Sequence, residues 1–182
     1  MRATQLAIVW IGAILAEGAV GAEPPPINKP APPFSLRDRE GALVSLSDLA
    51  YPGQEKASRP RKVVLLDFFR TDCQPCRKAL PRLVELQKKL GAKPVKIIVV
   101  ALLEEEEGQE KLDRFLQETK LPLLVLVDPY GSAAKKYVSH KGGLQIPALF
   151  LVDRTGVLRR RLQGAEAESV PKLATQLEEL LR

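Results

Sequence analysis

Residues 62–80 read Lys-Val-Val-Leu-Leu-Asp-Phe-Phe-Arg-Thr-Asp-Cys-Gln-Pro-Cys-Arg-Lys-Ala-Leu. Val63 to Phe69 are apolar apart from Asp67, which is the pattern of a strand covered on both faces. From Gln74 to Leu90 apolar residues recur at three- and four-residue intervals, and this spacing predicts a helix. The stretch 93–103 is again a buried strand by its composition. A strand, a helix and a second strand in this order predict a βαβ unit with parallel strands.

The two cysteines of the chain, Cys73 and Cys76, lie where the first strand passes into the helix. Residues three apart share a helix face, so the two sulfurs can bond. The free N–H groups and the positive dipole end of a helix N-terminus lower a thiol pKa, and Arg70 nearby acts in the same direction. Since the thiolate is the reactive form, Cys73 is the predicted nucleophile and Cys76 the residue that resolves the mixed disulfide.

Two other interpretations of the cysteine pair are a purely structural disulfide and half of a metal site. A disulfide that closes so short a loop constrains the unfolded chain little. Half of a zinc site would need ligands from another chain. The context of strand, Cys-x-x-Cys and helix therefore favours redox chemistry.

The rest of the sequence continues the alternation of strands and helices. We expect a hairpin at 34–46, helices at 47–49, 109–120, 132–138 and 169–181, and strands at 123–127, 148–152 and 157–162. This order predicts one α/β domain with a mixed central sheet, helices on both faces and an N-terminal β-hairpin extension.

Several short motifs, taken as a set, resemble the TlpA/ResA-like family of the thioredoxin superfamily. They are Ala31-Pro-Pro-Phe-Ser-Leu36, Val63–Phe69, Cys73-Gln-Pro-Cys-Arg77, Leu126-Val-Asp-Pro-Tyr-Gly131, Gln145-Ile-Pro147 and Ala148–Gly156. The resemblance covers residues 31–182. It implies a thioredoxin fold and the activity of an extracytoplasmic thiol–disulfide oxidoreductase.

The resemblance also implies roles for three further residues. Ile146 and Pro147 match the cis-proline element, which lies against the Cys-x-x-Cys and would offer the Ile146 backbone to an extended partner peptide. Asp67 matches the buried acid of thioredoxin. Burial in so apolar a strand raises a carboxyl pKa, so Asp67 would take or give the Cys76 proton near neutral pH.

Two positions depart from the family pattern. Asp72 stands where a Trp usually precedes the first cysteine, and its charge should raise the pKa of the Cys73 thiol. Ala79 stands where this branch often carries a Glu, which leaves Asp67 as the candidate acid. The residues expected to tune the redox pair are Arg70, Asp72, Gln74 and Pro75.

The N-terminal residues 1–22 differ from the rest. Met1-Arg2 is a positive start, Leu6 to Ala16 is an apolar run, and Val20-Gly21-Ala22 supplies small residues, as in a cleaved secretory signal peptide. The run is shorter than the about 20 apolar residues of a spanning helix, although an uncleaved anchor is the alternative. Residues 23–33 contain six prolines and predict a stiff spacer before a domain at 34–182. The expected location is periplasmic or otherwise extracytoplasmic.

Composition narrows the function further. The chain has 182 residues, 28 basic and 22 acidic, and a net charge of +6, which gives no argument for nucleic acid. One His and two Cys cannot form a closed four-ligand zinc site. No metal or other cofactor is expected.

These observations predict a thiol–disulfide oxidoreductase outside the cytoplasm, and the family resemblance implies that it reduces protein disulfides. The resemblance implies service in cytochrome c maturation or copper-site assembly. The expected partners are proteins with disulfides or reduced cysteines and a membrane electron donor, with a membrane contact only if the leader is uncleaved.

Two alternatives remain open. A copper-binding, metallochaperone-type module would use two soft thiolates, with His140 as the one available imidazole. A thiol peroxidase of this fold would want a Thr three residues before the reactive cysteine, where this chain has Arg70.

Overall fold

The computed structural model describes residues 23–51, 61–103, 108–140, 143–164 and 170–181. The predicted leader, residues 1–22, lies outside the described residues. Within the described ranges no helix combines the length and apolar character that crossing a membrane requires.

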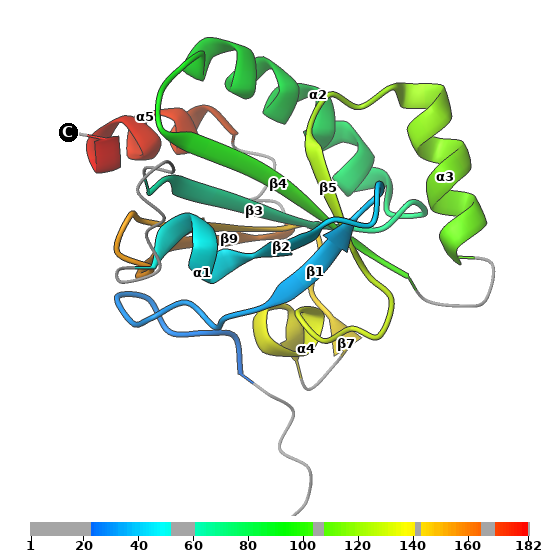
Figure 1. Cartoon of the computed structure of the whole chain (residues 1–182), viewed down its shortest axis with the longest axis horizontal. Coiled ribbons are helices and arrows are strands. Elements are labelled where there is room, and N and C mark those ends of the chain that lie inside the picture. The colour runs from blue at the N-terminus through cyan, green and yellow to red at the C-terminus, as the bar shows by residue number, and fades with distance from the viewer. Residues whose placement is uncertain (1–22, 52–60, 104–107, 141–142, 165–169, 182) are drawn as a thin grey trace, which may run out of the picture.

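Among the described residues, seven strands form one mixed sheet in the order β2-β1-β5-β4-β3-β8-β9 (Figure 1). Their bounds are β1 Ser35–Asp38, β2 Leu43–Ser45, β3 Val63–Phe69, β4 Val95–Leu102, β5 Leu124–Asp128, β8 Ala148–Val152 and β9 Leu158–Gln163. Strands β3, β4 and β5 are parallel, and the other pairings are antiparallel. The predicted βαβ unit, hairpin and mixed sheet are confirmed.

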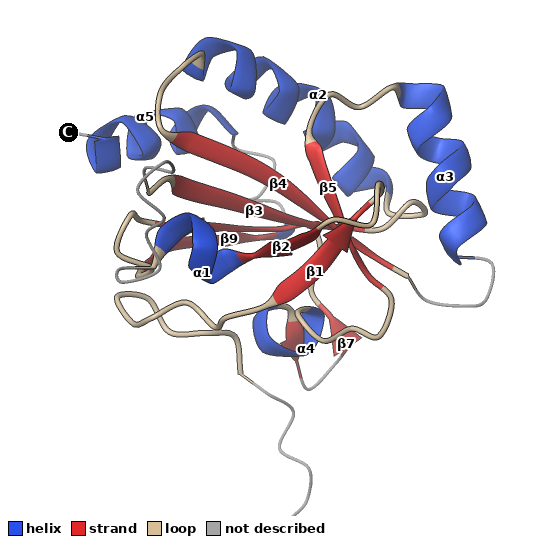
Figure 2. Ribbon diagram, viewed as in Figure 1, coloured by secondary structure: helices blue, strands red, loops and turns tan. Residues whose placement is uncertain are grey.

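In the part of the chain that the structure describes, five helices cover the two faces of this sheet (Figure 2). They are α1 Leu46–Ala50, α2 Gln74–Leu90, α3 Gly108–Thr119, α4 Ala134–Tyr137 and α5 Val170–Leu181. Helices α2, α3 and α5 pack on one face and form a core with the odd-numbered residues of β3. Helices α1 and α4 pack on the other face, against the even-numbered residues of the same strand. Strand β3 is therefore buried along its whole length, which explains its nearly continuous apolar sequence.

A second, two-stranded sheet was not predicted from the sequence. It pairs β6 (Ser139–His140) with β7 (Gly143–Leu144). His140 lies in β6 with its side chain exposed. Strands of two residues carry too few side chains to show the alternation by which strands are recognised.

The N-terminal segment corrects the predicted spacer. Residues 28–33 pack onto the domain: Asn28 N–H donates to Leu158 O (2.7 Å), Leu158 N–H donates to Lys29 O (2.9 Å), and Ala31 N–H donates to Gly156 O (2.8 Å). The Tyr137 hydroxyl donates to Pro32 O (2.7 Å), and Ala31 is 1% exposed. The spacer interpretation is wrong for these residues, because β9 is an edge strand whose free backbone groups they satisfy.

Candidate active site

The two cysteines occupy the first turn of α2, directly after the loop that follows β3. Cys73 is the N-cap residue, and its Sγ accepts a hydrogen bond from Cys76 N–H at 3.2 Å. Pro75 sits in the first helical turn, where its missing N–H costs no intrahelical bond. The two sulfurs form a disulfide, with the Cα atoms 5.3 Å apart. The predicted pairing and its place at the helix N-terminus are confirmed.

The two sulfurs differ in their access to solvent. Cys76 is completely buried on the face of α2 that packs against the sheet, whereas Cys73 is only partly buried at the helix end. A partner can therefore approach Cys73 and not Cys76. Gln74 and Pro75, between them, are exposed.

Arg70 and Asp72 form an ion pair beside Cys73. Arg70 Nε donates to one carboxylate oxygen of Asp72 at 2.9 Å, and a terminal guanidinium nitrogen donates to the other at 2.7 Å. The sequence suggested two independent charges with opposite effects on the thiolate. The structure shows a bidentate pair in which each charge offsets the other.

Asp67 lies in the middle of β3, completely buried. It pairs with Val99 of β4 and Leu149 of β8. Strand alternation directs its side chain to the same face as Leu65 and Phe69, which belong to the core that contains Cys76. Desolvation by burial raises the pKa of Asp67 to about 7, as predicted.

Three carboxylates are buried in the described part of the chain, and two of them are well bonded. Asp128 accepts from the backbone N–H groups of Ser132, Ala133 and Ala134. Asp153 accepts from Arg159 and from the Thr155 hydroxyl and backbone. By contrast, neither oxygen of Asp67 has a hydrogen-bond partner. Buried polar groups are normally satisfied, so an exception beside a redox pair is a candidate functional group.

The Ile146–Pro147 peptide bond is cis, as the resemblance implied. Ala148, which follows it, pairs with Phe68 near the end of β3, so this loop and the Cys73 loop lie at the same edge of the sheet. The Pro147 carbonyl accepts from Gly164 N–H at 3.0 Å. The Ile146 backbone makes no hydrogen bond to another described residue. It is thus available to pair with an extended peptide.

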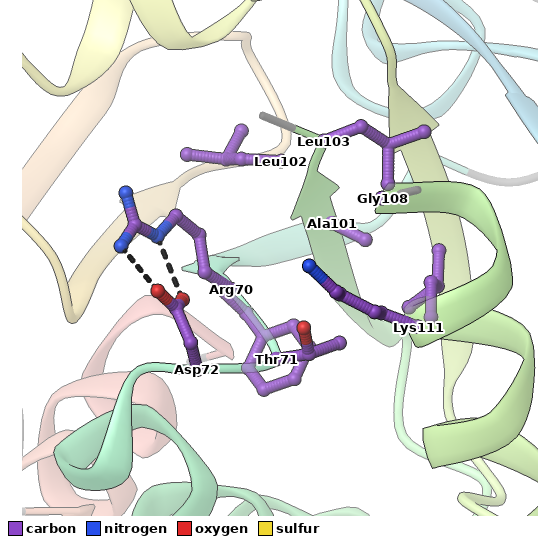
Figure 3. Close-up of a pocket in the computed structure, with 10 residues that line it drawn as sticks. Arg70, Thr71, Asp72, Ala101, Leu102, Leu103, Gly108 and Lys111 are labelled. Carbon is purple, nitrogen blue, oxygen red and sulfur yellow. Dashed lines mark hydrogen bonds and ion pairs between the residues drawn. The ribbon is translucent and has the colours of Figure 1, made fainter. Parts of the chain in front are cut away.

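A cavity of about 170 Å³ adjoins the loop before Cys73 (Figure 3). Its floor is apolar, from Phe69, Ala101 and Leu112. Figure 3 shows the Arg70–Asp72 pair on one side and Lys111 reaching in from α3. The sequence did not indicate Lys111, because the fold brings α3 to this loop from a distant part of the chain.

Ala79 is buried on α2, so a methyl group occupies the position where the family branch often carries a Glu. Among the described residues no group of three His, Cys, Asp or Glu side chains gathers as a metal site would require.

Comparison with known proteins agrees with this geometry. Residues 27–161 match the AhpC/TSA family. The chain is 31% identical over 156 residues to thiol-disulfide oxidoreductase ResA of Bacillus thuringiensis subsp. konkukian, covering 86% of this chain and 77% of that protein. It is 27% identical over 164 residues to sporulation thiol-disulfide oxidoreductase A of Bacillus subtilis, covering 89% and 85%.

Solved structures show the same fold. A Chlorobium tepidum protein assigned as the thiol:disulfide interchange protein DsbE superposes with a TM-score of 0.67 at 25% identity, covering 86% of this chain and 99% of that one. StoA from Bacillus subtilis superposes with a TM-score of 0.60 at 23% identity, covering 80% and 97%. The family match, the relatives and the disulfide at the start of α2 together show that the chain belongs to the AhpC/TSA family, as a ResA/TlpA-like thiol–disulfide oxidoreductase of the thioredoxin superfamily.

Proposed function

We propose that this oxidoreductase works as a reductase of protein disulfides outside the cytoplasm. One observation carries its exchange chemistry, and the resemblance to the TlpA/ResA-like family supports the reducing direction. An accessible sulfur, Cys73, caps α2, while the buried sulfur, Cys76, shares its core with a carboxylate that has no hydrogen-bond partner, Asp67. In this arrangement Cys73 at the surface is the attacking sulfur. Cys76, in the same core as the proton acceptor Asp67, is the resolving sulfur.

In the first step the Cys73 thiolate attacks one sulfur of a client disulfide. A bond between Cys73 and the client forms, the client S–S bond breaks, and the second client sulfur leaves as a thiolate that takes up a proton. The Cys76 N–H donates to the Cys73 sulfur in the disulfide form, and this N–H together with the positive end of the α2 dipole would stabilise the negative charge of the thiolate.

In the second step Cys76 resolves the mixed disulfide. Its thiol gives a proton to the Asp67 carboxylate, and its sulfur attacks Cys73 Sγ. The Cys73–Cys76 disulfide forms and the first client sulfur leaves. A carboxyl group with a pKa of about 7 is present in both forms at neutral pH, so it accepts the proton and releases it later. The client has gained two electrons from the cysteine pair, and a membrane electron donor supplies two further electrons to reduce the Cys73–Cys76 disulfide again.

We propose that the loop that contains Pro147 binds the client peptide. The Ile146 backbone groups lie at the same sheet edge as Cys73 and are unbonded within the described chain. An extended client segment can pair with them as an added strand and bring its disulfide to Cys73.

Two cysteine variants test the reaction. Cys73→Ser should abolish the reduction of insulin disulfides, whereas Cys76→Ser should accumulate mixed disulfides on Cys73, whose mass spectra identify the clients. Turnover by Cys73→Ser at the parent rate would exclude this mechanism.

The location has its own experiment. The signal-like pattern of residues 1–22 and the persistence of disulfides outside the cytoplasm support export. Protein recovered from a periplasmic fraction should begin at Glu23. A full-length chain in the membrane fraction would indicate an anchor, and a full-length chain in the cytosol would contradict export.

We further propose cytochrome c maturation as the client pathway, which rests on the resemblance to the TlpA/ResA-like family. A strain without this protein should lose covalently bound haem in its c-type cytochromes. Expression of the parent chain should restore it, and Cys73→Ser should not.

A further inference from the structure

A second cavity lies between α2 and α3. Along α2 it extends from Arg77, next to the cysteines, toward the C-terminal end of the helix. It measures about 480 Å³. Its apolar lining comes from Leu80, Pro81, Val84, Phe115, Leu121 and Pro122. Arg77, Glu85 and Lys88 add charged side chains to its rim. We call this site the α2–α3 groove. An apolar centre with a charged rim is the composition of a protein-recognition surface.

The groove begins beside the redox pair. Arg77 follows Cys76 in the chain, and its guanidinium lies 5.3 Å from the centre of the Phe115 ring. The groove residues of α2 then run from Arg77 to Lys88, a helix length of roughly 16 Å. A partner whose disulfide sits at Cys73 can therefore extend along this groove for about three helical turns.

The charge of α2 indicates what kind of segment fits. This helix exposes five cationic side chains and one anionic one, Glu85. The cations are Arg77, Lys78, Arg82, Lys88 and Lys89. An acidic partner would be attracted to this surface, and a basic one repelled.

We propose that the α2–α3 groove docks an acidic amphipathic helix of the protein whose disulfide is reduced. Its apolar residues, spaced by three and four, fill the groove, and its acidic side chains face Arg77 and Lys88. This inference rests on the proposed reductase function and adds a docking site that starts next to the cysteines and runs along α2.

Lys88 and Lys89 supply a matched pair of variants for the test. Both are exposed at the end of α2, but only Lys88 lines the groove. The probe is a cysteine-free helical peptide with Leu at three- and four-residue spacing and Glu elsewhere, and its binding is measured by fluorescence anisotropy at low ionic strength. Lys88→Glu should weaken binding about five- to tenfold, while Lys89→Glu should change it less than about twofold.

Three results of the binding experiment would overturn the proposal. The first is the absence of binding to the parent protein, and the second is equal binding of a peptide with Lys in place of Glu. The third is an equal loss in both variants together with binding to phosphatidylglycerol vesicles, which would make α2 a general cationic surface facing a membrane.

A kinetic experiment separates this proposal from the proposed function. The substrates are a short disulfide peptide and the same peptide extended by the acidic helix. The extension should raise kcat/KM by about tenfold for the parent and for Lys89→Glu, and by much less for Lys88→Glu. Reduction of both peptides at equal rates would contradict the docking proposal and still support the reductase function. If neither peptide were reduced, both proposals would be contradicted.

Discussion

Asp67 and Cys76 border the same apolar core: strand alternation places Asp67 on the face of β3 that α2 covers, and Cys76 is buried on the side of α2 that packs against that face. Both are completely buried. Asp128 and Asp153 are also buried, but each accepts hydrogen bonds. Asp67 has no such bonds. Burial raises the pKa of Asp67 to about 7, so its carboxyl group can hold or release a proton near neutral pH.

We predict that Asp67→Asn slows the release of the client from Cys73. The amide cannot accept the Cys76 proton, so resolution should fall by about a hundredfold at neutral pH. Single-turnover release should rise with pH around 7 in the parent, because the pKa of Asp67 is about 7. Asp67→Asn should lose this rise near pH 7, and its rate of client release should increase only at higher pH. Asp113→Asn on α3 is the control, and an unchanged profile in Asp67→Asn would exclude the proton role.

The same substitution should stabilise the oxidised protein at alkaline pH. Burial raises the pKa of Asp67 from 3.8 to about 7, so between these values the folded protein holds a proton that the unfolded chain has released. Stability therefore falls as pH rises through this range and stays lowered above it. Near pH 8, Asp67→Asn should raise the free energy of unfolding by up to about 4 kcal/mol, and near pH 3 by little.

Urea unfolding at several pH values measures this effect, with the disulfide intact. A lower stability of Asp67→Asn near pH 8 would mean that the carboxylate is stabilised by contacts after all. The direction of the change is informative because most buried polar substitutions destabilise.

The Arg70–Asp72 pair should balance the charge at Cys73. Asp72→Asn leaves the guanidinium without its carboxylate and should lower the midpoint of the pH profile for Cys73 alkylation, in the reduced protein, by roughly half a unit. Arg70→Gln should raise it by a similar amount. The double variant should lie close to the parent. Shifts in the same direction for both single variants would contradict this balance.

Residues 28–33 should contribute to stability as part of the domain. A chain that begins at Phe34 loses the three backbone bonds to residues 156–158 and the bond from Tyr137 to Pro32. At about 1 kcal/mol for each bond, its free energy of unfolding should fall by roughly 3–4 kcal/mol relative to a chain that begins at Glu23. Equal denaturation midpoints would show that the segment is a spacer.

Much of the site followed from local signals. The apolar run of β3, the helical spacing after it and the position of the cysteines between them required no distant contact to interpret. Asp67 was conspicuous as the one acid in an apolar strand. The Ile146–Pro147 element was identified only by resemblance, since spacing alone does not distinguish a cis proline.

Other features depend on which segments the fold brings together. Nothing in the local sequence shows that Asp72 pairs with Arg70, because either side chain could point elsewhere. Lys111 reaches the loop before Cys73 only because α3 follows the strand next to β3. The prolines of residues 28–33 suggested an extended spacer, and that local preference does not reveal the edge strand that binds it.

The sequence by itself determined the strand–helix unit, the reactive pair and the candidate acid, because these depend on periodicity and on neighbours along the chain. Tertiary structure alone decided that Cys76 and Asp67 share a core, that two charges beside Cys73 offset each other and that a groove continues from the redox pair along α2. Burial, pairing and charge balance arise between segments far apart in the chain. They become fixed only when the sheet and its helices pack together.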